Sequence, residues 1–281
     1  MGWVLTPESL SSLRRNIHAE FSGGFDINTY EMCTAIVGST AHNTYVKKED
    51  ITSDDIDISG VFCSPPDYIL SLKNIETWAE AKEINGIICD WTFRSLKHYC
   101  KLLMSCNPDV LCLLYLEPRF YLYKHKLFDE LIANRDLFLS IKAYDSFAGY
   151  AFSQSQRMER IGDLDKMGEK RKNLVLKYGY DVKNAAHCLR ILYMGIDLVK
   201  TGTMTVWQPE ERAGILRDIK QGNWKVQEVK DLITESYDEL RKVKEDSPLN
   251  KNPHFHECNE LITKLHLKYW YETGDSQNIG L

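Results

Sequence analysis

The sequence predicts an α+β protein in which a small strand-rich region comes first and helices follow. Short apolar runs with the alternation of buried strands occur in the first hundred residues, at 32–38, 55–63 and 84–93. From about residue 125 almost to the end, apolar residues recur at helical spacing instead. Strands followed by helices are typical of an α+β domain joined to a helical one. We therefore predict an N-terminal domain over 1–140 and a helical C-terminal domain over 141–281.

The composition narrows the class of protein. The formal net charge of −5 argues against a surface coated in positive potential for sequence-independent nucleic-acid binding, although a local basic patch is compatible with it. No apolar run approaches the length of a membrane span, and the N-terminus lacks the order of a signal peptide. The eight cysteines form no CxxC pair, so we expect buried free thiols in a cytoplasmic protein.

The individual elements follow from periodicity and punctuation. A helix is expected over 7–21, with Thr6 as its N-cap and Pro7 in its first turn. Residues 68–72 are expected to be extended. Later helices are expected at 94–105, 125–134, 143–161, 184–200, 209–220, 224–246 and 255–271.

An acidic pair marks the second predicted strand. Asp55 and Asp57 share one face of that strand, while Ile56 and Ile58 point to the core. Two carboxylates on one strand repel each other, and a cation that neutralises them removes that cost. Mg²⁺ suits such a site because it binds through one or two carboxylates together with substrate phosphates.

A glycine–serine pair ends the strand before it. Gly38 lets a backbone approach a phosphate without a Cβ in the way, and Ser39 adds a hydroxyl donor. Together with the acidic pair, these residues predict a site for a metal and a nucleotide.

A third acid lies on the strand predicted at 84–93. Asp90 stands among apolar residues, where an unpaired charge is expensive to bury. If this strand lies beside that of Asp55 and Asp57, the three acids form one cluster. The alternative is that the acids at 54–57 make a charged turn and Asp90 caps a helix.

A basic stripe is predicted in the helical half. Lys183, His187 and Arg190 share one face of a helix that begins near residue 181. Such a stripe can hold a triphosphate or neutralise the leaving pyrophosphate. The alternative is a partly buried histidine among ordinary surface charges.

Two weaker candidates accompany this stripe. Gln154 and Arg157, one helical turn apart, are candidates for the same pocket. The segment 166–177 combines basic residues with the adjoining Tyr178 and Tyr180, which suits a single-stranded polynucleotide, or is simply a solvated face.

The order of these features resembles a known superfamily. Apolar-Gly-Ser, a spacer, Asp-apolar-Asp-apolar and a third strand acid are similar to the signature of the DNA polymerase β-like nucleotidyltransferases. The chain resembles more closely the branch of RNA-ligase-associated predicted nucleotidyltransferases of bacteria and phages. The similar pieces are GSTAHNT (38–44), SDDIDISGVF (53–62), Asp90 before an amphipathic helix, CNPDVL (106–111), GYAFSQSQR (149–157) and YDVKNAAHCLRIL (180–192).

The resemblance has one departure. The branch usually carries an aromatic–glycine pair after Gly-Ser, where this chain has His42 and Asn43. Asn tolerates left-handed backbone conformations better than most residues, so the turn can survive the exchange.

The resemblance implies a small mixed sheet flanked by helices, dependence on Mg²⁺ or Mn²⁺, and transfer of a nucleoside monophosphate from a nucleoside triphosphate such as ATP. The metal ligands would be Asp55, Asp57 and Asp90, and the nucleotide-binding residues Gly38, Ser39, Lys183, His187 and Arg190. Asp90 would also be the base toward the acceptor hydroxyl. The helical domain would complete the nucleotide pocket.

The sequence leaves three alternatives for the acceptor of the nucleotide. An RNA or DNA end is expected first, because the branch resembles a partner of RNA ligases. A protein side chain or small molecule is the second possibility, and the net charge of −5 favours it slightly. The third is a nucleotide-binding module without catalysis.

Overall fold

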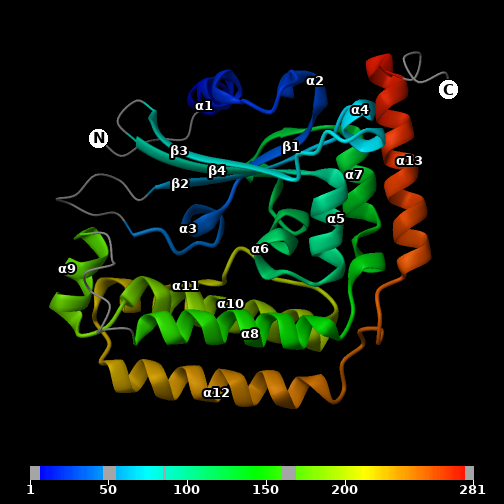
Figure 1. The fold of residues 1–281 in the computed structure, drawn as a ribbon. Coiled ribbons are helices and arrows are strands. Elements are labelled where there is room, and N and C mark those ends of the chain that lie inside the picture. Colours follow the sequence, from blue (N-terminus) through cyan, green and yellow to red (C-terminus); the bar gives the residue numbers. More distant parts are fainter. Residues whose placement is uncertain (1–6, 47–54, 85–86, 160–168, 276–281) are drawn as a thin grey trace.

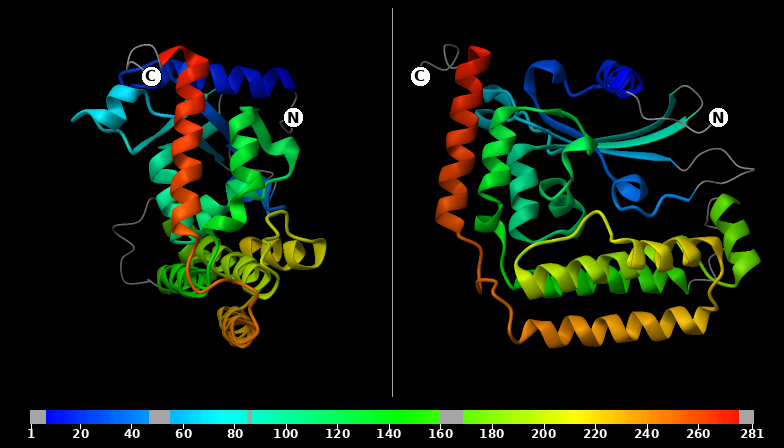
Figure 2. Two further views of the ribbon diagram at one scale, coloured as in Figure 1. Left: turned by 90° about the vertical axis from the view of Figure 1, so that its right-hand side faces the viewer. Right: turned by 180° about the vertical axis from the view of Figure 1, so that it is seen from behind.

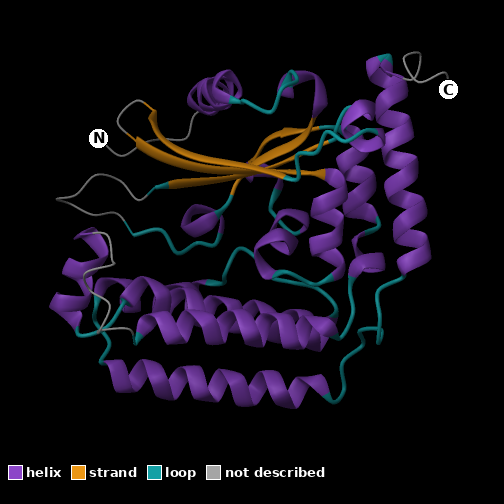
Figure 3. Cartoon of the chain, in the orientation of Figure 1, coloured by secondary structure: helices purple, strands orange, loops and turns teal. Residues whose placement is uncertain are grey.

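A five-stranded mixed sheet, with helices around it and a layer of long helices on one side, makes up the computed structural model of the chain (Figures 1 and 3). The structure describes residues 7–46, 55–84, 87–159 and 169–275. The strands are β1 (Glu31–Ile36), β2 (Ile56–Phe62), β3 (Thr77–Ile84), β4 (Ile87–Ser95) and β5 (Tyr121–Lys124). They lie in the order β3-β4-β2-β1-β5, with β2 parallel to β4 and the other neighbours antiparallel. The predicted α+β class is confirmed.

Each predicted helix is found to within a few residues, and shorter helices that were not predicted accompany them. The helices are α1 (Pro7–Glu20), α2 (Ile27–Tyr30), α3 (Gly38–Ala41), α4 (Pro66–Leu70), α5 (Leu96–Met104), α6 (Pro108–Leu111), α7 (Lys126–Ala133), α8 (Lys142–Met158), α9 (Glu169–Tyr178), α10 (Val182–Thr201), α11 (Glu210–Gln221), α12 (Val226–Lys244) and α13 (Phe255–Thr273). Those that were not predicted are α2, α3, α4, α6 and α9. Three short 3-10 turns complete them, at Cys112–Leu114, Pro118–Phe120 and Arg135–Phe138.

Several elements differ from the prediction. The segment 68–72, expected to be extended, lies largely in α4, because Pro66 occupies the first turn of a helix there. The strand expected at 84–93 is shorter: Ile84 ends β3 and pairs with Ile87, which begins β4. β3, β5 and α9 were not predicted. β3 is an edge strand with mostly exposed side chains, so it lacks the apolar alternation that reveals a half-buried strand.

One face of the sheet is covered by α1. Leu13 and Ile17 of α1 pack in a buried cluster with Ile58 of β2 and with Trp91 and Phe93 of β4. Because strand side chains alternate, the neighbours of these residues on β2 and β4 point to the opposite face, toward the long helices. The two acids on β2 and β4 therefore face the helical layer.

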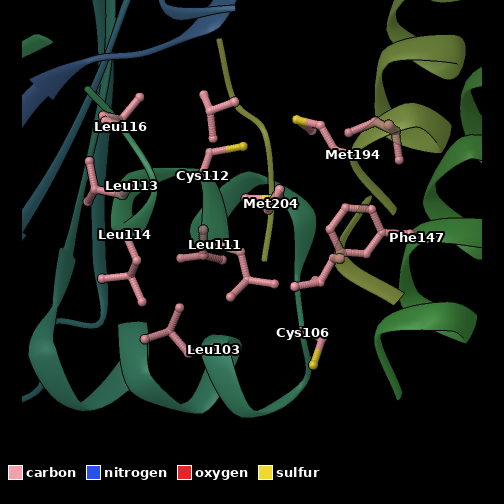
Figure 4. Packing of buried hydrophobic residues seen from close by; sticks show 14 of the residues in the cluster. Leu103, Cys106, Leu111, Cys112, Leu113, Leu114, Leu116, Phe147, Met194 and Met204 are labelled. Atoms are coloured by element: carbon pink, nitrogen blue, oxygen red, sulfur yellow. The ribbon is translucent and has the colours of Figure 1, made fainter. Parts of the chain in front are cut away.

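A second, larger cluster joins the sheet to the helical layer. Figure 4 shows Leu111 of α6, Phe147 of α8, Met194 of α10 and Met204 among its buried side chains. The predicted boundary at residue 140 falls just before α8 begins. The cluster thus includes residues from both sides of that boundary.

The last helix returns to the sheet. Figure 2 shows α13 running along the side of the sheet region, next to α5 and α7. Tyr269 donates a hydrogen bond to the carbonyl oxygen of Glu31 at 2.8 Å, and the indole N–H of Trp270 donates to that of Ser64 at 2.9 Å. α13 therefore fixes both ends of the segment that contains β1 and β2.

Two predictions about environment can be compared with the fold. All eight cysteines are buried free thiols, as predicted. None of the helices in the described part of the chain has the length and apolar character that a membrane span requires.

Candidate active site

The glycine–serine turn lies against the acid of the neighbouring strand. β1 ends at Ile36, and the amide of Val37 donates to the carbonyl oxygen of Asp57 at 2.8 Å. Gly38 then adopts a φ of +63°, and a Cβ built on it would lie 1.8 Å from Asp57 Oδ2. Both the left-handed backbone and this contact exclude a side chain, so Gly38 brings the turn directly beside the carboxylate.

Two of the predicted acids are register partners. Asp57 on β2 pairs with Asp90 on β4 in the parallel ladder. Paired residues of adjacent strands project from the same face of the sheet, so these two carboxylates lie side by side on that face. Asp55 lies one residue before β2, and its charge acts on both of the other acids. The three acids are therefore electrostatic neighbours, which is part of what the predicted cluster requires.

The electrostatics of the cluster show crowding of negative charge. Burial, and to a lesser extent the charges of Asp90 and Asp55, raises the pKa of Asp57 to about 6, against the opposing effect of Arg190. Burial and the charge of Asp55 also raise the pKa of Asp90. A site in which the charged form of the carboxylates is unfavourable favours a bound cation, because the cation neutralises them.

The alternative reading of the acids is wrong. Asp57 is in the body of β2 and Asp90 in the body of β4, so neither belongs to a charged turn. The helix after β4 is capped by Ser95, whose hydroxyl accepts from the amide of His98 at 3.4 Å. Asp54 lies outside the described residues.

A cavity of about 330 Å³ separates the acids from the helical layer. Figure 1 shows α3, which begins at Gly38, between the sheet and the pair α10 and α11. The lining residues are Gly38, Ser39, Thr44, Val46, Asp55, Asp57, Leu174, Lys183, Ala186, His187, Arg190, Leu216 and Lys220. All of the predicted site residues except Asp90 are in this lining. Asp90 stands beside the cavity, on the next strand.

α10 presents the predicted basic stripe to the cavity. Asp181 begins the helix by accepting from the amides of Lys183 and Asn184, each at 3.0 Å. The ring of His187 makes an edge contact with that of Tyr150, with the centroids 5.6 Å apart. The buried Nε of Arg190 has no hydrogen-bond partner among the described residues. An arginine with an unsatisfied donor beside a cavity is suited to an anionic ligand.

Sequence reasoning missed the contribution of α11. Lys220 lines the cavity and donates to the carbonyl oxygen of Thr44 at 2.7 Å. Leu216, one turn before it, lines the cavity too. The two residues share a helix face, which is the signal that could have suggested a common environment. The sequence holds no signal that this face meets residue 44.

The weaker candidates are not brought into the cavity. Gln154 is buried on α8 and Arg157 is exposed, and neither is in the lining. Of the segment 166–177, the part before residue 169 lies outside the described residues. In the part that α9 contains, Leu174 lines the cavity, while the ammonium of Lys177 lies 4.8 Å from the ring centroid of Tyr178.

The turn after Ser39 contains Asn43, which stands where the similar family usually has glycine. Asn43 has a φ of 59°, the left-handed region that glycine adopts most easily. The amide of Thr44 donates to the carbonyl oxygen of Ser39 at 3.0 Å. The prediction that Asn preserves this turn is confirmed.

The acids suit Mg²⁺ as a ligand set. Within the described ranges no three His, Cys, Asp or Glu side chains are grouped so that they could hold a metal ion by themselves. Mg²⁺ does not need such a group, because it retains waters and shares its coordination between one or two carboxylates and substrate phosphates. Asp57 and its register partner Asp90 offer two such carboxylates, next to a cavity that basic side chains of α10 also line.

The fold and this arrangement define a class of protein. A small mixed sheet with a Gly-Ser turn beside acids on two adjacent strands, facing a helical region, is that of a polymerase β-like nucleotidyltransferase. The chain belongs to the RNA repair pathway DNA polymerase beta family (RlaP), whose family model matches residues 32–264. This membership confirms the resemblance seen in the sequence.

A solved structure and the curated proteins add little to this assignment. The chain is similar to a nucleotidyltransferase-like protein from Exiguobacterium sibiricum 255-15, with 11% identity and a TM-score of 0.32 over 84% of this chain and 75% of that one. A likeness this weak carries no information about the site. No curated protein sequence matches the chain.

Proposed function

We propose that the protein is a Mg²⁺-dependent nucleotidyltransferase that transfers a nucleoside monophosphate from a nucleoside triphosphate to a hydroxyl acceptor. The observation that carries the proposal is the register pair of Asp57 and Asp90 beside the turn at Gly38. Burial raises the pKa of both acids, so their position on two parallel strands costs stability, and such a cost is typical of a functional site.

The residues of the cavity divide into two walls. Gly38 and Ser39 form the wall of the sheet, where the backbone of the turn and the serine hydroxyl hold the β- and γ-phosphates. Lys183, His187 and Arg190 form the wall of α10 and neutralise the triphosphate and the leaving pyrophosphate. The two walls together bind the nucleotide between the sheet and the helices.

The acids hold the metal and receive the proton. Asp55, Asp57 and Asp90 would hold Mg²⁺, or Mn²⁺, which supplies charge neutralisation at the reacting phosphate. Asp90 is not in the lining of the nucleotide cavity but on the strand next to Asp57, and we assign the acceptor to that side. The acceptor oxygen forms a bond to the α-phosphorus as the bond from that phosphorus to the bridging oxygen breaks. Asp90 takes the hydroxyl proton, and pyrophosphate leaves.

An RNA end is the acceptor that we propose, with a DNA end as the closest variant. The family description places related proteins in RNA repair. Arg94 supports a phosphate-bearing acceptor: it lies on the same face of β4 as Asp90, about 13 Å along the strand. Arg94 is half-buried, and its hydrogen bond to a described residue is a long one, 3.5 Å to the Ser59 hydroxyl. A guanidinium held in this way is suited to a phosphate of the acceptor.

The buried free thiols also fit a reducing compartment, so we place the protein in the cytoplasm.

One labelling experiment tests the function. Each nucleoside triphosphate, labelled at the α-phosphate, is incubated with the protein, Mg²⁺ and one of three acceptors: single-stranded RNA, single-stranded DNA or a protein extract. We expect label on the RNA 3′ end and an equal release of pyrophosphate, and neither with Asp57→Asn. Label on protein alone would identify a protein side chain as the acceptor. Metal-dependent triphosphate binding without transfer to any acceptor would indicate a non-catalytic module.

A further inference from the structure

The loop that follows the phosphate-binding turn is held by the connection between α10 and α11. His42 is buried, and its Nδ1–H donates to the carbonyl oxygen of Val206 at 3.0 Å. The side-chain amide of Asn43 donates to the carbonyl oxygen of Gln208 at 3.0 Å. The amide of Gln208 donates in turn to the carbonyl oxygen of His42 at 3.4 Å. Residues more than 160 positions away in sequence thus determine the path of this loop.

Two cations of α11 hold the carbonyl groups of the same loop. Arg217 donates from Nη1 to the carbonyl oxygen of Asn43 at 2.7 Å, and it is oriented by an ion pair with Glu210. Lys220, one turn further along, donates to the carbonyl oxygen of Thr44 at 2.7 Å. Hydrogen bonds from charged donors are stronger than neutral ones, so these two contacts are the firmest ties on the loop.

The loop transmits this restraint to the phosphate-binding turn. The amide of His42 donates to the carbonyl oxygen of Gly38 at 3.2 Å, and that of Thr44 to the carbonyl oxygen of Ser39 at 3.0 Å. Asn43 between them has the left-handed φ of 59°, which costs free energy in a residue with a side chain. A loop that contains such a residue keeps its shape only when its surroundings hold it.

We propose that α11 positions the phosphate-binding turn, with Arg217 as a positioning residue and Lys220 as a nucleotide-binding residue. Arg217 acts through Asn43 and does not line the cavity, whereas Lys220 lines the same cavity as Asp57 and Ser39. The inference rests on the proposed function, because the ligand of Lys220 is the triphosphate. It extends the nucleotide site from α10 to a helix that no motif of the sequence marks.

Arg212 provides a matched control on the same helix. Its Nη1 donates to both carboxylate oxygens of Asp197 of α10, at 3.0 and 2.9 Å, and it makes no hydrogen bond to the loop over 42–44 among the described residues. Arg212→Ala therefore removes one arginine and one tie between α10 and α11 without releasing the turn.

The test compares Arg217→Ala, Arg217→Lys, Lys220→Ala and Arg212→Ala with the wild type. The dissociation constants of ATP, GTP, CTP and UTP with Mg²⁺ are measured by calorimetry, and KM and kcat by pyrophosphate release. We expect Arg217→Ala and Lys220→Ala to raise Kd and KM for the nucleotide roughly 10-fold, as the loss of a charge-assisted hydrogen bond implies. For Arg217→Ala, kcat at saturation should stay within about 3-fold, because the acids are unchanged. Arg217→Lys should recover part of the loss, and Arg212→Ala should stay within about 2-fold.

A second measurement separates this inference from the proposed function. Amide hydrogen exchange of the peptide over 38–44, without nucleotide, should be faster in Arg217→Ala than in Arg212→Ala or the wild type. Unchanged exchange there, unchanged nucleotide affinity in Arg217→Ala, or an equal loss of affinity in Arg212→Ala would overturn the positioning role. A third result is a wild type that binds no nucleotide while amide exchange over 38–44 is still faster in Arg217→Ala. That result would overturn the proposed function but support the role of Arg217 in holding the turn.

Discussion

Asp57 and Asp90 occupy paired positions on the parallel strands β2 and β4, and the Cα of Gly38 approaches the first of them too closely to carry a Cβ. This relationship brings together a turn, an acid of the same motif and an acid from a later strand. The predictions below follow from it and from the charges around it.

Replacing Asp57 should separate stability from activity. An acid whose pKa rises from 3.8 to about 6 on folding binds protons more tightly in the folded state. The free energy of unfolding of the protein therefore falls as the pH rises from 3.8 to about 6, and it stays lower at neutral pH. Without metal at pH 7, Asp57→Asn should raise the free energy of unfolding by about 1–3 kcal/mol while abolishing transfer.

Thermal unfolding with and without Mg²⁺ measures this effect. Mg²⁺ should raise the Tm of the wild type and leave that of Asp57→Asn nearly unchanged. A variant that is less stable than the wild type at pH 7, or that still responds fully to Mg²⁺, would show that Asp57 is neither strained by its neighbours nor a metal ligand.

The affinity for Mg²⁺ should depend on pH in a defined window. A carboxylate must be deprotonated to bind a metal, and the pKa of Asp57 is about 6 because of burial and the nearby acids. Below about pH 6 the apparent dissociation constant of Mg²⁺ should therefore rise by up to about 10-fold per pH unit, and above it the constant should level off. Titration of Mg²⁺ by calorimetry between pH 5 and 8 checks this, and a flat profile would contradict it.

Substitution of Gly38 should damage the site more than the fold. A Cβ there would lie 1.8 Å from Asp57 Oδ2, and the φ of +63° is unfavourable for alanine. Gly38→Ala should cost about 1–2 kcal/mol of stability from backbone strain alone, and it should displace the carboxylate, lowering kcat/KM by roughly 100-fold or more.

Gly149 of α8 is the control for that substitution. Nothing lies within 4 Å of a Cβ built on it, and it is an exposed helix position. Gly149→Ala should raise the free energy of unfolding by about 0.5–1 kcal/mol and leave kcat/KM unchanged. Equal losses of activity in both variants would show that the contact between position 38 and Asp57 is not the cause of the loss.

Loss of Arg94 should weaken binding of the acceptor and leave binding of the nucleotide unchanged. Arg94→Ala removes the cation on the acceptor side of Asp90, so we expect weaker binding of single-stranded RNA with a salt slope that is smaller by about one. The Kd for the triphosphate should not change, because Arg94 is outside the lining of the cavity. Fluorescence anisotropy of a labelled oligonucleotide at several salt concentrations provides the measurement. An unchanged affinity and slope would place the acceptor elsewhere.

The predicted residues lie together where their arrangement depends on local geometry. Gly38 and Ser39 follow a strand, and Asp55 and Asp57 alternate along the next one, so their arrangement is set by a few consecutive residues. The stripe on α10 is similarly local, because helix geometry alone places Lys183, His187 and Arg190 on one face. These residues all line one cavity, as expected.

The elements that escaped prediction lack such a signal. β3 is exposed on most of its length, and β5 has four half-buried residues, so neither shows the apolar alternation of a strand. Arg217 and Lys220 contact residues 174 and 176 positions away. Nothing in the pattern of α11 distinguishes their contacts from solvated charges.

Short-range periodicity was thus sufficient to specify the α+β class, most of the long helices, the acidic strand, the glycine–serine turn and the basic helix face. Those properties depend on residues within one or two turns or along a single strand. Long-range pairing supplied the rest: the alignment of Asp57 with Asp90 is a matter of register between two strands, and the hold of α11 on Asn43 depends on how the chain folds back. Register and packing minimise the free energy of the whole chain, so they are not encoded in any one segment.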